Sequence, residues 1–454
     1  MKFGGTSVGT GARIAGVAEL VASRLAEGPF VVVSAMAGVT DALLALSRSA
    51  REGRRADADA ALAALGEGHR AAVDALALGA TWAAALRDEI AREVGRLEAL
   101  ATGVSLLGEL TPRTADALCA AGELLSAGLA AAALERRGVP VAHVDPRDWM
   151  ATDGTHGAAV PDETALARKA AERLLPERAA GRVVVTGGFV GASPDGATTT
   201  LGRGGSDYSA ALLGAALHDA GAPVSAIEIW TDVDGILTGD PRLVPAARLV
   251  PEVGYAEASE LSFFGARVLH PATIRPAITR GIPVRVRNTF RPDVAGTTVR
   301  AEADGTGVRA VAMRPGVAAF FVRSPRMLLA HGYAARVFSV FERHAVPVDV
   351  IATSEVSISV TVDGGAPLEA LARDLAEIAE VEVLRGLAVV SVVGRRIRST
   401  PRVAATVFGA LGDLNVFLIS QGASETNLTF VVAEDAAPEA VRRLHRDLFE
   451  KEAA

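Results

Sequence analysis

The stretch RVVVT at residues 182–186 decides the fold, because it is a short β-branched run between longer segments of helical composition. Runs of Val, Ile and Thr bounded by Gly, Pro or Asp are typical of strands. The intervening segments, such as 58–106 and 116–137, are rich in helix-forming Ala, Leu, Glu and Arg. We therefore predict an α/β fold with a mainly parallel sheet and helices on both faces. The other strand-like runs are FVVVS at 30–34, VAHV at 141–144 and IEIW at 227–230.

A second region follows the turn-forming stretch RPDVAGT at 291–297, which places a domain boundary near 300–312. Beyond it, a pattern of strand, helix, two strands and helix occurs twice with a period of roughly 70 residues, which predicts two ferredoxin-like α+β modules. The first copy has expected elements near 317–323, 333–344, 347–351, 355–361 and 366–378, and the second near 387–394, 401–411, 415–420, 427–432 and 437–448. The predicted domains are an α/β domain at 1–300 and modules at 312–384 and 385–454, which can share strands.

The composition limits the classes of partner. With 454 residues, 50% of them hydrophobic and 22% charged, the chain is long enough for two to four packed domains. A net charge of −7 argues against a nucleic-acid partner, because phosphate binding requires clustered Lys and Arg. Apolar runs stay short of the ~20 residues of a membrane span, and the start MKFGG lacks the apolar segment of an export signal. We therefore expect a cytoplasmic protein with a small-molecule ligand and no membrane partner, in which the single cysteine, Cys119, has no catalytic role.

The stretch KFGGTS at 2–7 has the composition of a phosphate-binding segment. Lysine is rare in this chain and occurs only as Lys2, Lys169 and Lys451. Lys2 would end a first strand, and the glycines after it leave backbone N–H groups open to a close approach by an anion. In the Walker P-loop the lysine follows the glycines, so this stretch does not predict that fold. The alternative is that a lysine after the first methionine reflects only a translation-start preference.

A second cluster, TTTLGRGGSD at 198–207, leads into a helical run at 208–218. Glycine amides and a helix N-terminus gather positive potential beside Arg203, whose guanidinium can hold a carboxylate with two hydrogen bonds. Asp207 has a simpler alternative role as a helix-capping carboxylate in the first turn. That alternative accounts for neither Arg203 nor the glycines, so the cluster predicts an anion-binding site.

The third cluster is WTDVDGI at 230–236, which is followed by DPR at 240–242. Its two carboxylates lack the rest of the EF-hand spacing, which argues against calcium. A turn-rich loop after a parallel strand is well placed to hold a nucleotide, with Arg242 available for phosphate. Separately, Glu123 on a helical stretch could receive an ammonium group, although a lone glutamate is more often a solvated surface residue.

Together these segments resemble the aspartokinases of the amino-acid kinase superfamily. The match is colinear along nearly the whole chain and rests on six blocks: KFGGTSV at 2–8, SAMAGVT at 34–40, GEL at 122–124, RGGSD at 203–207, TDVDGI at 231–236 and FGARVLHP at 264–271. The resemblance implies an amino-acid kinase fold followed by two ACT domains that sense an amino-acid end product. It also implies phosphorylation of the β-carboxylate of aspartate by ATP and Mg²⁺, the first step toward lysine, threonine, methionine and diaminopimelate.

The resemblance also assigns residues to sites. The implied catalytic residues are Lys2 and Asp207. The implied ATP site consists of Lys2, Phe3, Gly4, Gly5, Thr231, Asp232, Leu237, Arg242, Arg267 and Val268. The implied aspartate site, with Glu123 near the ammonium group and Arg203 near a carboxylate, consists of Thr40, Glu123, Arg203, Gly204, Gly205 and Ser206. The implied effector site consists of Met327, Gly332, Tyr333, Val348, Asp349, Thr353, Ser354 and Glu355.

The implied reaction needs little side-chain chemistry. A carboxylate nucleophile is already ionised at about pH 7, so no general base is required. Catalysis then consists of alignment and charge neutralisation, in which Lys2, Mg²⁺ and glycine amides would stabilise the phosphoryl group and Asp207 would orient the basic residues. A homodimer or higher homo-oligomer is expected, because small ACT sheets leave edges that a symmetric partner can cover.

Three departures from the family pattern bear on function. Only Met1 precedes Lys2, where the family has several strand residues, and Arg267 stands at a usual lysine position. The first ACT module resembles that of lysine-sensitive aspartokinases around residues 348–355, but Leu329 and Ala330 occupy positions that are polar there. Lysine is therefore one candidate effector, and absence of inhibition at millimolar lysine would exclude it.

Two other functions fit parts of the sequence. A related kinase would phosphorylate glutamate or acetylglutamate, but acetylglutamate has no ammonium group for Glu123. A ligand-binding regulatory protein with an inactive kinase domain would account for the short N-terminus, although the intact stretches 203–207 and 231–236 argue against it. A substrate panel separates the first alternative, and ATP-dependent turnover excludes the second.

Overall fold

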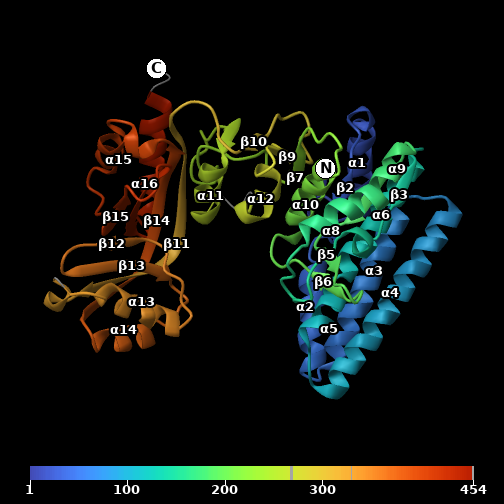
Figure 1. Ribbon diagram of the computed structural model, residues 1–454, viewed down its shortest axis with the longest axis horizontal. Helices are drawn as coiled ribbons and strands as arrows, with labels where there is room; N and C mark the ends of the chain where they lie inside the picture. The colour runs from blue at the N-terminus through green and yellow to red at the C-terminus, as the bar shows by residue number, and fades with distance from the viewer. Residues whose placement is uncertain (266–268, 329, 452–454) are drawn as a thin grey trace. The chain divides into compact units, whose positions relative to one another are not determined.

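The structure is a computed structural model that describes residues 1–265, 269–328 and 330–451 (Figure 1). The chain forms two compact units. Unit 1 comprises Met1–Gly235 and His270–Ala301, and unit 2 comprises Ile236–Leu269 and Glu302–Ala454. Unit 1 therefore differs from the predicted domain at 1–300 in the segment 236–269. The boundaries at 300, 312 and 384 stay predictions.

The centre of unit 1 is a mainly parallel sheet, as predicted. The strands lie in the spatial order β3 (Val141–His143), β4 (Val183–Gly187), β2 (Val31–Val33), β1 (Lys2–Phe3), β7 (Ile227–Thr231), β9 (Val284–Asn288) and β10 (Thr297–Arg300). Neighbouring strands from β3 to β9 are parallel, and β10 pairs with β9 in the antiparallel direction. Parallel neighbours require crossover connections, which the helices between the strands provide.

Alternate side chains of these strands face two layers of helices. On one face, Phe3, Val33 and Val185 join a hydrophobic core with α1 (Gly11–Ala22) and α6 (Ala121–Arg136). On the other face, α10 (Gly205–Asp219) contacts β1, β2 and β7. Both faces are covered, which is why the strands are runs of apolar residues. The shorter elements of this unit are α7 (Pro146–Trp149), α8 (Glu163–Lys169), α9 (Leu175–Ala179), the hairpin of β5 (Val190–Ala192) and β6 (Thr198–Thr200), and α12 (Pro271–Ile278).

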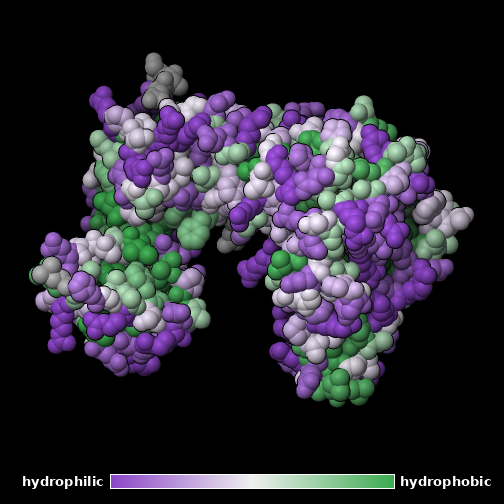
Figure 2. Space-filling view, viewed as in Figure 1, coloured by the Kyte–Doolittle hydropathy of each residue, from purple (hydrophilic) through white to green (hydrophobic). Residues whose placement is uncertain are grey.

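A bundle of helices extends from this unit. The members α2 (Val39–Arg51), α3 (Arg55–Ala75), α4 (Ala80–Leu107) and α5 (Pro112–Cys119) pack against one another. The segment 58–106, which has helical composition, forms two helices, because the chain turns at Ala77, whose φ of 48° is left-handed. The segment 116–137 likewise contains parts of two helices, α5 and α6. Figure 2 shows hydrophobic residues at the end of this bundle, and Leu106 and Leu107 at the end of α4 are exposed.

The segment that spans α5 and α6, Pro112–Arg136, is long and apolar enough to cross a membrane when judged by length and composition alone. In the folded chain, 89% of its most apolar window is buried inside the protein. A mostly buried segment of this kind is typical of the core helix of a soluble protein, so it is only a weak indication of a membrane span.

Unit 2 contains one antiparallel sheet with the order β12 (Ile351–Thr353), β13 (Ser357–Asp363), β11 (Gly307–Arg323), β14 (Glu380–Arg395), β16 (Asn427–Ala433) and β15 (Leu418–Gln421). β11 and β14 are long and pair with each other along most of their length. The last part of β11 also pairs with β13, whereas β14 pairs with β16. The two ferredoxin-like modules therefore share one sheet.

Each module has its own helical layer and core. Phe320 and Val360 pack with α13 (Tyr333–Arg343) and α14 (Leu368–Ala376), whereas Val390 and Phe430 pack with α15 (Val403–Leu411) and α16 (Ala437–His445). Val244 also joins the second core, so this core draws on chain far upstream of residue 385. The strand expected at 347–351 lies instead at 351–353, as β12. The unit also holds β8 (Glu252–Gly254) and α11 (Tyr255–Phe263).

Candidate active site

Lys2 lies in the central strand of the unit 1 sheet. The register of β1 places it between Val32 of β2 and Ile229 of β7. Its side chain is buried, and its Nζ lies 2.7 Å from Oδ1 of Asp207. A buried ammonium group is unfavourable without a counter-charge, so this ion pair fixes the position of Lys2. The two predicted catalytic residues are thus in direct contact.

The loop after β1 is fixed by the ends of neighbouring strands. The Gly4 N–H donates to the Trp230 carbonyl over 3.0 Å, and Ser7 Oγ lies 2.7 Å from Thr289 Oγ1. Phe3 turns its side chain away from this loop, because its ring is buried against Trp230 at a centroid distance of 6.1 Å. Only the backbone of Phe3 is therefore placed to contact a ligand.

The glycines of this loop keep its backbone close to the lysine. A Cβ on Gly4 would lie 3.7 Å from Lys2 Nζ. A Cβ on Gly5 would lie 3.0 Å from the carbonyl oxygen of Ala35, which is tighter than ordinary packing. The absence of side chains here leaves backbone N–H groups beside a buried positive charge, an arrangement suited to phosphate oxygens.

The N-terminus of α10 brings Ser206 and Asp207 to the same strand ends. Gly204 precedes the helix with a φ of 70°, a left-handed conformation that favours glycine. A Cβ on Gly188, just after β4, would lie 2.7 Å from Cβ of Ser206, and a Cβ on Gly205 would lie 2.5 Å from the ring of Phe189. The first turn of α10 therefore packs directly against the chain that leaves β4, and its dipole favours an anion there.

Glu123 lies in the first turn of α6 and is only 3% exposed. Its carboxylate accepts the Ala35 N–H, but its Oε2 has no hydrogen-bond partner among the described residues. Burial raises the pKa of Glu123 to about 8, and the backbone hydrogen bonds and the charge of Lys2 only partly oppose that shift. An unpartnered buried oxygen is typical of a group that a ligand completes. The alternative role as a solvated surface residue is therefore wrong.

Arg203 lies in the turn before α10 with an exposed side chain. It lines a hollow of about 650 Å³ together with Tyr208, His270 and Arg275. Within the described ranges of the chain, its guanidinium makes no ion pair, whereas most other arginines of unit 1 do. A guanidinium without a carboxylate partner in the chain is available to a carboxylate of a ligand.

Thr40 lies in the first turn of α2 and is half-buried. A Cβ on Gly122 would lie 2.7 Å from Cβ of Ala35 and 3.0 Å from Cγ1 of Val39. This close approach holds the start of α2 against α6 beside Glu123. The predicted aspartate residues from α2, α6 and α10 thus gather around the carboxyl ends of β1, β2 and β4.

Thr231 ends β7, and its carbonyl accepts the Thr289 N–H over 2.8 Å. Its hydroxyl donates to Oδ1 of Asp232 over 3.2 Å. Farther along the same loop, Asp234 accepts a hydrogen bond of 2.8 Å from Nδ2 of Asn288. The end of β9 therefore fixes the loop that was predicted to hold the nucleotide.

The remaining predicted ATP residues lie outside unit 1 or outside the described residues. Leu237 and Arg242 belong to unit 2. The guanidinium of Arg242 lies 2.6 Å from Asp240, and its side chain is 87% exposed. Arg267 and Val268 lie outside the described residues. Their roles stay predictions.

Comparison with known proteins agrees with this geometry. The amino acid kinase family matches residues 1–288, and an ACT domain matches residues 322–372 and 390–448. Lysine-sensitive aspartokinase 3 of Escherichia coli (strain K12) is 40% identical over 458 residues, which cover 99% of this chain and 98% of that protein. The chain belongs to the aspartokinase family. Chloroplastic aspartokinase 1 of Arabidopsis thaliana is 36% identical to this aspartokinase, over 99% of this chain and 80% of its own length.

Solved aspartokinase structures share the fold of this aspartokinase. The structure of E. coli aspartokinase III in complex with aspartate and ADP (R-state) has a TM-score of 0.81, 39% identity and 99% coverage of both chains. The structure of the same enzyme in complex with lysine and aspartate (T-state) has a TM-score of 0.83, 39% identity, and coverage of 99% of this chain and 98% of its own. The predicted amino-acid kinase fold with two ACT modules is confirmed.

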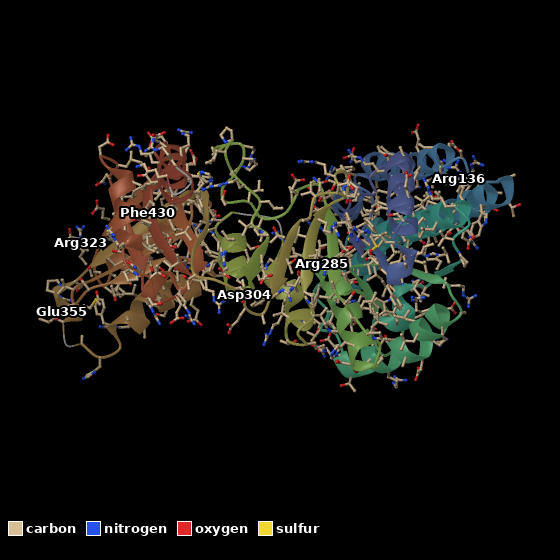
Figure 3. All side chains as sticks on the ribbon, turned by 90° about the horizontal axis from the view of Figure 1, so that it is seen from above. Arg136, Arg285, Asp304, Arg323, Glu355 and Phe430 are labelled. Carbon is tan, nitrogen blue, oxygen red and sulfur yellow. The ribbon has the colours of Figure 1, made fainter. Side chains whose placement is uncertain are left out.

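The first ACT module of this aspartokinase has a hollow of about 370 Å³. Figure 3 labels Glu355, which lies in the loop between β12 and β13, near Arg323 at the end of β11. Four predicted effector residues, Met327, Gly332, Tyr333 and Glu355, line this hollow. Leu329, which follows Met327 in the chain, lies outside the described residues. The lining residues are Met327, Leu328, Ala330, Gly332, Tyr333, Ala334 and Glu355.

The other four predicted effector residues are not among the lining residues of this hollow. Val348 packs against the core of the module. Asp349 forms an ion pair with Arg314, and burial raises the pKa of Asp349 despite that partner. Thr353 ends β12, and Ser354 Oγ lies 2.7 Å from Oγ of Ser357. Their part in an effector site stays a prediction.

Residues other than the predicted ones also shape the active site. A Cβ on Gly187 would lie 3.2 Å from Cβ of Glu123, so the pair Gly187–Gly188 admits both α6 and α10 to the end of β4. A glycine pair directly after a predicted strand was an available signal. Buried Asp116 accepts hydrogen bonds from the Gly157 N–H and the Thr200 hydroxyl, and so fixes the loop that packs on Gly202. These partners are 41 and 84 residues away, so the sequence gives no signal for them.

Proposed function

We propose that this aspartokinase transfers the γ-phosphoryl group of ATP to the β-carboxylate of L-aspartate and produces 4-phospho-L-aspartate. One observation supports this function most strongly. The Lys2–Asp207 ion pair lies within electrostatic reach of Glu123, whose Oε2 has no partner in the described part of the chain. The related E. coli aspartokinase III was solved with aspartate and ADP, which agrees with both substrates.

In this proposal, aspartate is held by opposite charges at its two ends. Its ammonium group donates to Oε2 of Glu123, which completes the hydrogen bonding of that buried carboxylate. Arg203 binds a carboxylate of aspartate with two parallel hydrogen bonds. The neighbouring residues that complete the proposed aspartate site are Thr40, Gly204, Gly205 and Ser206.

The proposed reaction is an in-line displacement. An oxygen of the β-carboxylate attacks the γ-phosphorus, a new O–P bond forms, and ADP leaves with the electrons of the broken bond. Lys2 and the backbone N–H group of Gly5 stabilise negative charge on the phosphoryl oxygens, while the N–H group of Gly4 is bonded to the Trp230 carbonyl and fixes the loop. Asp207 acts as a positioning residue, because its ion pair keeps the ammonium group of Lys2 at the end of β1.

We also propose that Mg²⁺ takes part as a partner of ATP, where it neutralises phosphate charge. Among the described residues, no group of three or more His, Cys, Asp or Glu side chains is arranged to hold a metal. Mg²⁺ in kinases is commonly held by one or two carboxylates together with substrate phosphates, so a protein cage is not needed. The proposed ATP contacts in unit 1 are Lys2, Phe3 through its backbone, Gly4, Gly5, Thr231 and Asp232.

An amino-acid effector is proposed for the hollow of the first ACT module, and lysine is the candidate. The E. coli relative is named lysine-sensitive and was solved with lysine. Glu355 supplies a carboxylate for an ammonium group, and Met327 and Tyr333 supply an apolar wall for an alkyl chain. The side chain of lysine has both features, an alkyl chain and a terminal ammonium group.

A cytoplasmic homodimer is the proposed assembly. β12 is at one end of the unit 2 sheet order, and its Ile351 is 41% exposed. A symmetric partner would cover this apolar edge. Sedimentation of the full chain at several concentrations, compared with Ile351→Lys, measures whether this edge associates.

A substrate panel tests the proposed function. We expect ATP consumption with Mg²⁺ and aspartate, little with glutamate, and none with acetylglutamate, because an acetylated nitrogen carries no positive charge for Glu123. Equal turnover of aspartate and acetylglutamate would contradict the role of Glu123. Absence of turnover with every acidic substrate would favour the regulatory-protein alternative.

A further inference from the structure

Asp116 is a buried carboxylate that the proposed reaction does not use. It lies in α5 and is 2% exposed. Its two oxygens accept hydrogen bonds from the Gly157 N–H over 3.0 and 3.1 Å, from Nδ1 of His156 over 2.8 Å and from the hydroxyl of Thr200. Hydrogen bonds to a buried carboxylate are strong and costly to lose, so Asp116 and its three partners keep fixed positions relative to one another.

The backbone that carries Arg203 is held by two of these partners. Thr200 lies three positions before Arg203 in the chain. Gly157 packs on Gly202, because a Cβ on Gly202 would lie 3.3 Å from the carbonyl oxygen of Gly157. Gly202 also has a φ of 75°, a left-handed conformation that favours glycine, so no side chain separates the two segments. Asp116 therefore fixes the turn that presents Arg203, through Thr200 and Gly157.

Asp116 also lies on the helical segment that carries Glu123. α5 passes into α6 at Ala120, which has helical dihedral angles and whose N–H bonds to the Asp116 carbonyl over 3.0 Å. Asp116 and Glu123 are seven positions apart, which is about two helical turns or about 10 Å along the axis. Residues two turns apart lie on the same side of a helix. The same side of one segment therefore carries Glu123 and, through Asp116, holds the turn of Arg203.

We propose that Asp116 is a positioning residue that fixes Arg203 relative to Glu123 and thereby makes the enzyme select aspartate over glutamate. This inference rests on the proposed function, in which Glu123 binds the ammonium group and Arg203 a carboxylate of the substrate. An amino acid held at both points presents its reacting oxygen at one place only. The additional methylene group of glutamate displaces that oxygen by about 1 Å, which is enough to lower the rate about 10²-fold.

A looser Arg203 would weaken this selection. Arg203 lies between Gly202 and Gly204 with an exposed side chain, so the turn itself restricts its backbone little. Without the bonds to Asp116, the turn would shift and accommodate the longer substrate, while aspartate would lose part of its binding. A purely structural role predicts a different result, because a loss of stability reduces the turnover of both substrates by the same factor.

Thr200→Val and Thr200→Ser test the bond that lies closest to Arg203 in the chain. Valine has nearly the shape of threonine but no hydroxyl donor, whereas serine keeps the donor. We expect Thr200→Val to raise the KM for aspartate about tenfold and to leave the KM for ATP unchanged. The ratio of kcat/KM for aspartate to kcat/KM for glutamate should also fall about tenfold. In Thr200→Ser all three values should stay close to those of the wild type.

Asp116→Asn weakens the whole network. The amide nitrogen of asparagine cannot accept a hydrogen bond, so at least one of the three donors loses its partner. We expect the aspartate-to-glutamate ratio to fall further than in Thr200→Val, by about 10²-fold. The matched control is Asp195→Asn, because Asp195 forms an exposed ion pair of 3.4 Å with Arg113 of the same helix, at the turn between β5 and β6. It should leave the ratio unchanged.

Several outcomes would overturn the proposal. Equal losses for both substrates in Thr200→Val would show that the network supports only the fold, and so would a similar fall of the ratio in Asp195→Asn. An unchanged ratio in Thr200→Val and Asp116→Asn, with activity intact, would exclude the role of Asp116 alone. If the wild type turns over neither aspartate nor glutamate, the proposed function fails and this inference fails with it. If circular dichroism shows that Asp116→Asn does not fold, the two Thr200 variants decide.

Discussion

At the scale of single residues, the environment gives Lys2 and Glu123 their chemistry. Both are buried, Lys2 in β1 and Glu123 in the first turn of α6, and a buried charge is unfavourable without a partner. Lys2 has its partner in Asp207, whereas Glu123 keeps an unpartnered oxygen and a pKa of about 8. Lys2 is therefore held in place by its ion pair, whereas Glu123 is expected to ionise when substrate binds.

Aspartate binding is expected to release a proton at about pH 7. The pKa of Glu123 of about 8 keeps its carboxyl group largely protonated in the free enzyme, and an ammonium group beside it lowers that pKa. Calorimetry in two buffers of different ionisation enthalpy measures the protons released. Glu123→Gln should release none and bind aspartate about 10²-fold more weakly, since it loses a charged hydrogen bond. Proton-neutral binding by the wild type at this pH would contradict the prediction.

The same group should make the stability of the substrate-free enzyme depend on pH. In the unfolded chain the pKa of a glutamate is about 4.3, and in the folded chain that of Glu123 is about 8. Between these values the folded state binds more protons, so the contribution of Glu123 is fully present below about pH 4.3 and is lost as pH rises through about 8. The difference in Tm between Glu123→Gln and the wild type should therefore increase with pH over this window. A constant difference would show that Glu123 is ionised in the free enzyme.

At the scale of elements, the site is assembled where helices meet the carboxyl ends of parallel strands. The first turns of α2, α6 and α10 all point to this edge, and glycines at the strand ends let them approach. The loops TDVDG and KFGGTS are fixed by hydrogen bonds to residues at the ends of β9 and β7, which use the backbone as well as the side chains of Asp234 and Ser7. Function at this scale depends on backbone spacing more than on the chemistry of any one residue.

Gly188→Ala tests this spacing. The new Cβ would lie 2.7 Å from Cβ and 2.8 Å from Cα of Ser206, so the start of α10 must move and carry Asp207 with it. We expect kcat/KM for aspartate to fall about 10²-fold, as a displacement of about 1 Å predicts. Gly16→Ala is the control, because a Cβ there meets nothing within 4 Å and stabilises α1 by about 0.5–1 kcal/mol. Unchanged steady-state kinetics in Gly188→Ala, with the fold confirmed by circular dichroism, would contradict this account.

At the scale of the whole molecule, each unit has its own sheet and core. Unit 2 joins two ACT modules through the long strands β11 and β14, so neither module has a separate sheet. The hollow proposed for an effector lies in the first module, among Met327, Tyr333 and Glu355. Regulation is therefore expected to depend on this module.

Lysine should inhibit the kinase, and Glu355→Ala should weaken that inhibition. Removing the carboxylate takes away the partner of an ammonium group at an exposed position, so we expect the half-inhibiting lysine concentration to rise about tenfold. Glu369→Ala, a charge removal elsewhere in unit 2, should leave the inhibition unchanged. Activity that persists unaltered at millimolar lysine would exclude lysine as the effector.

Most of the fold was predictable from the sequence, because each strand and helix carries its own local pattern. The runs at 182–186 and 227–230 became β4 and β7, and the repeated pattern after residue 312 became one sheet with two helical layers. The burial of Glu123 was not predictable, because it depends on how α6 packs against Gly187. The pairing of Asp349 with Arg314 was also hidden, since these residues are 35 positions apart.

The most direct test of the central claim is aspartate-dependent formation of an acyl phosphate, trapped by hydroxylamine as the hydroxamate in the presence of ATP and Mg²⁺. The comparison includes Lys2→Ala and, as a control, Lys169→Ala, whose lysine is half-buried and bonds only the Asp148 carbonyl among the described residues. We predict hydroxamate in the wild type and in Lys169→Ala, and a fall of about 10²–10³ in rate in Lys2→Ala. Absence of hydroxamate in the wild type, or an undiminished rate in Lys2→Ala, would contradict the account.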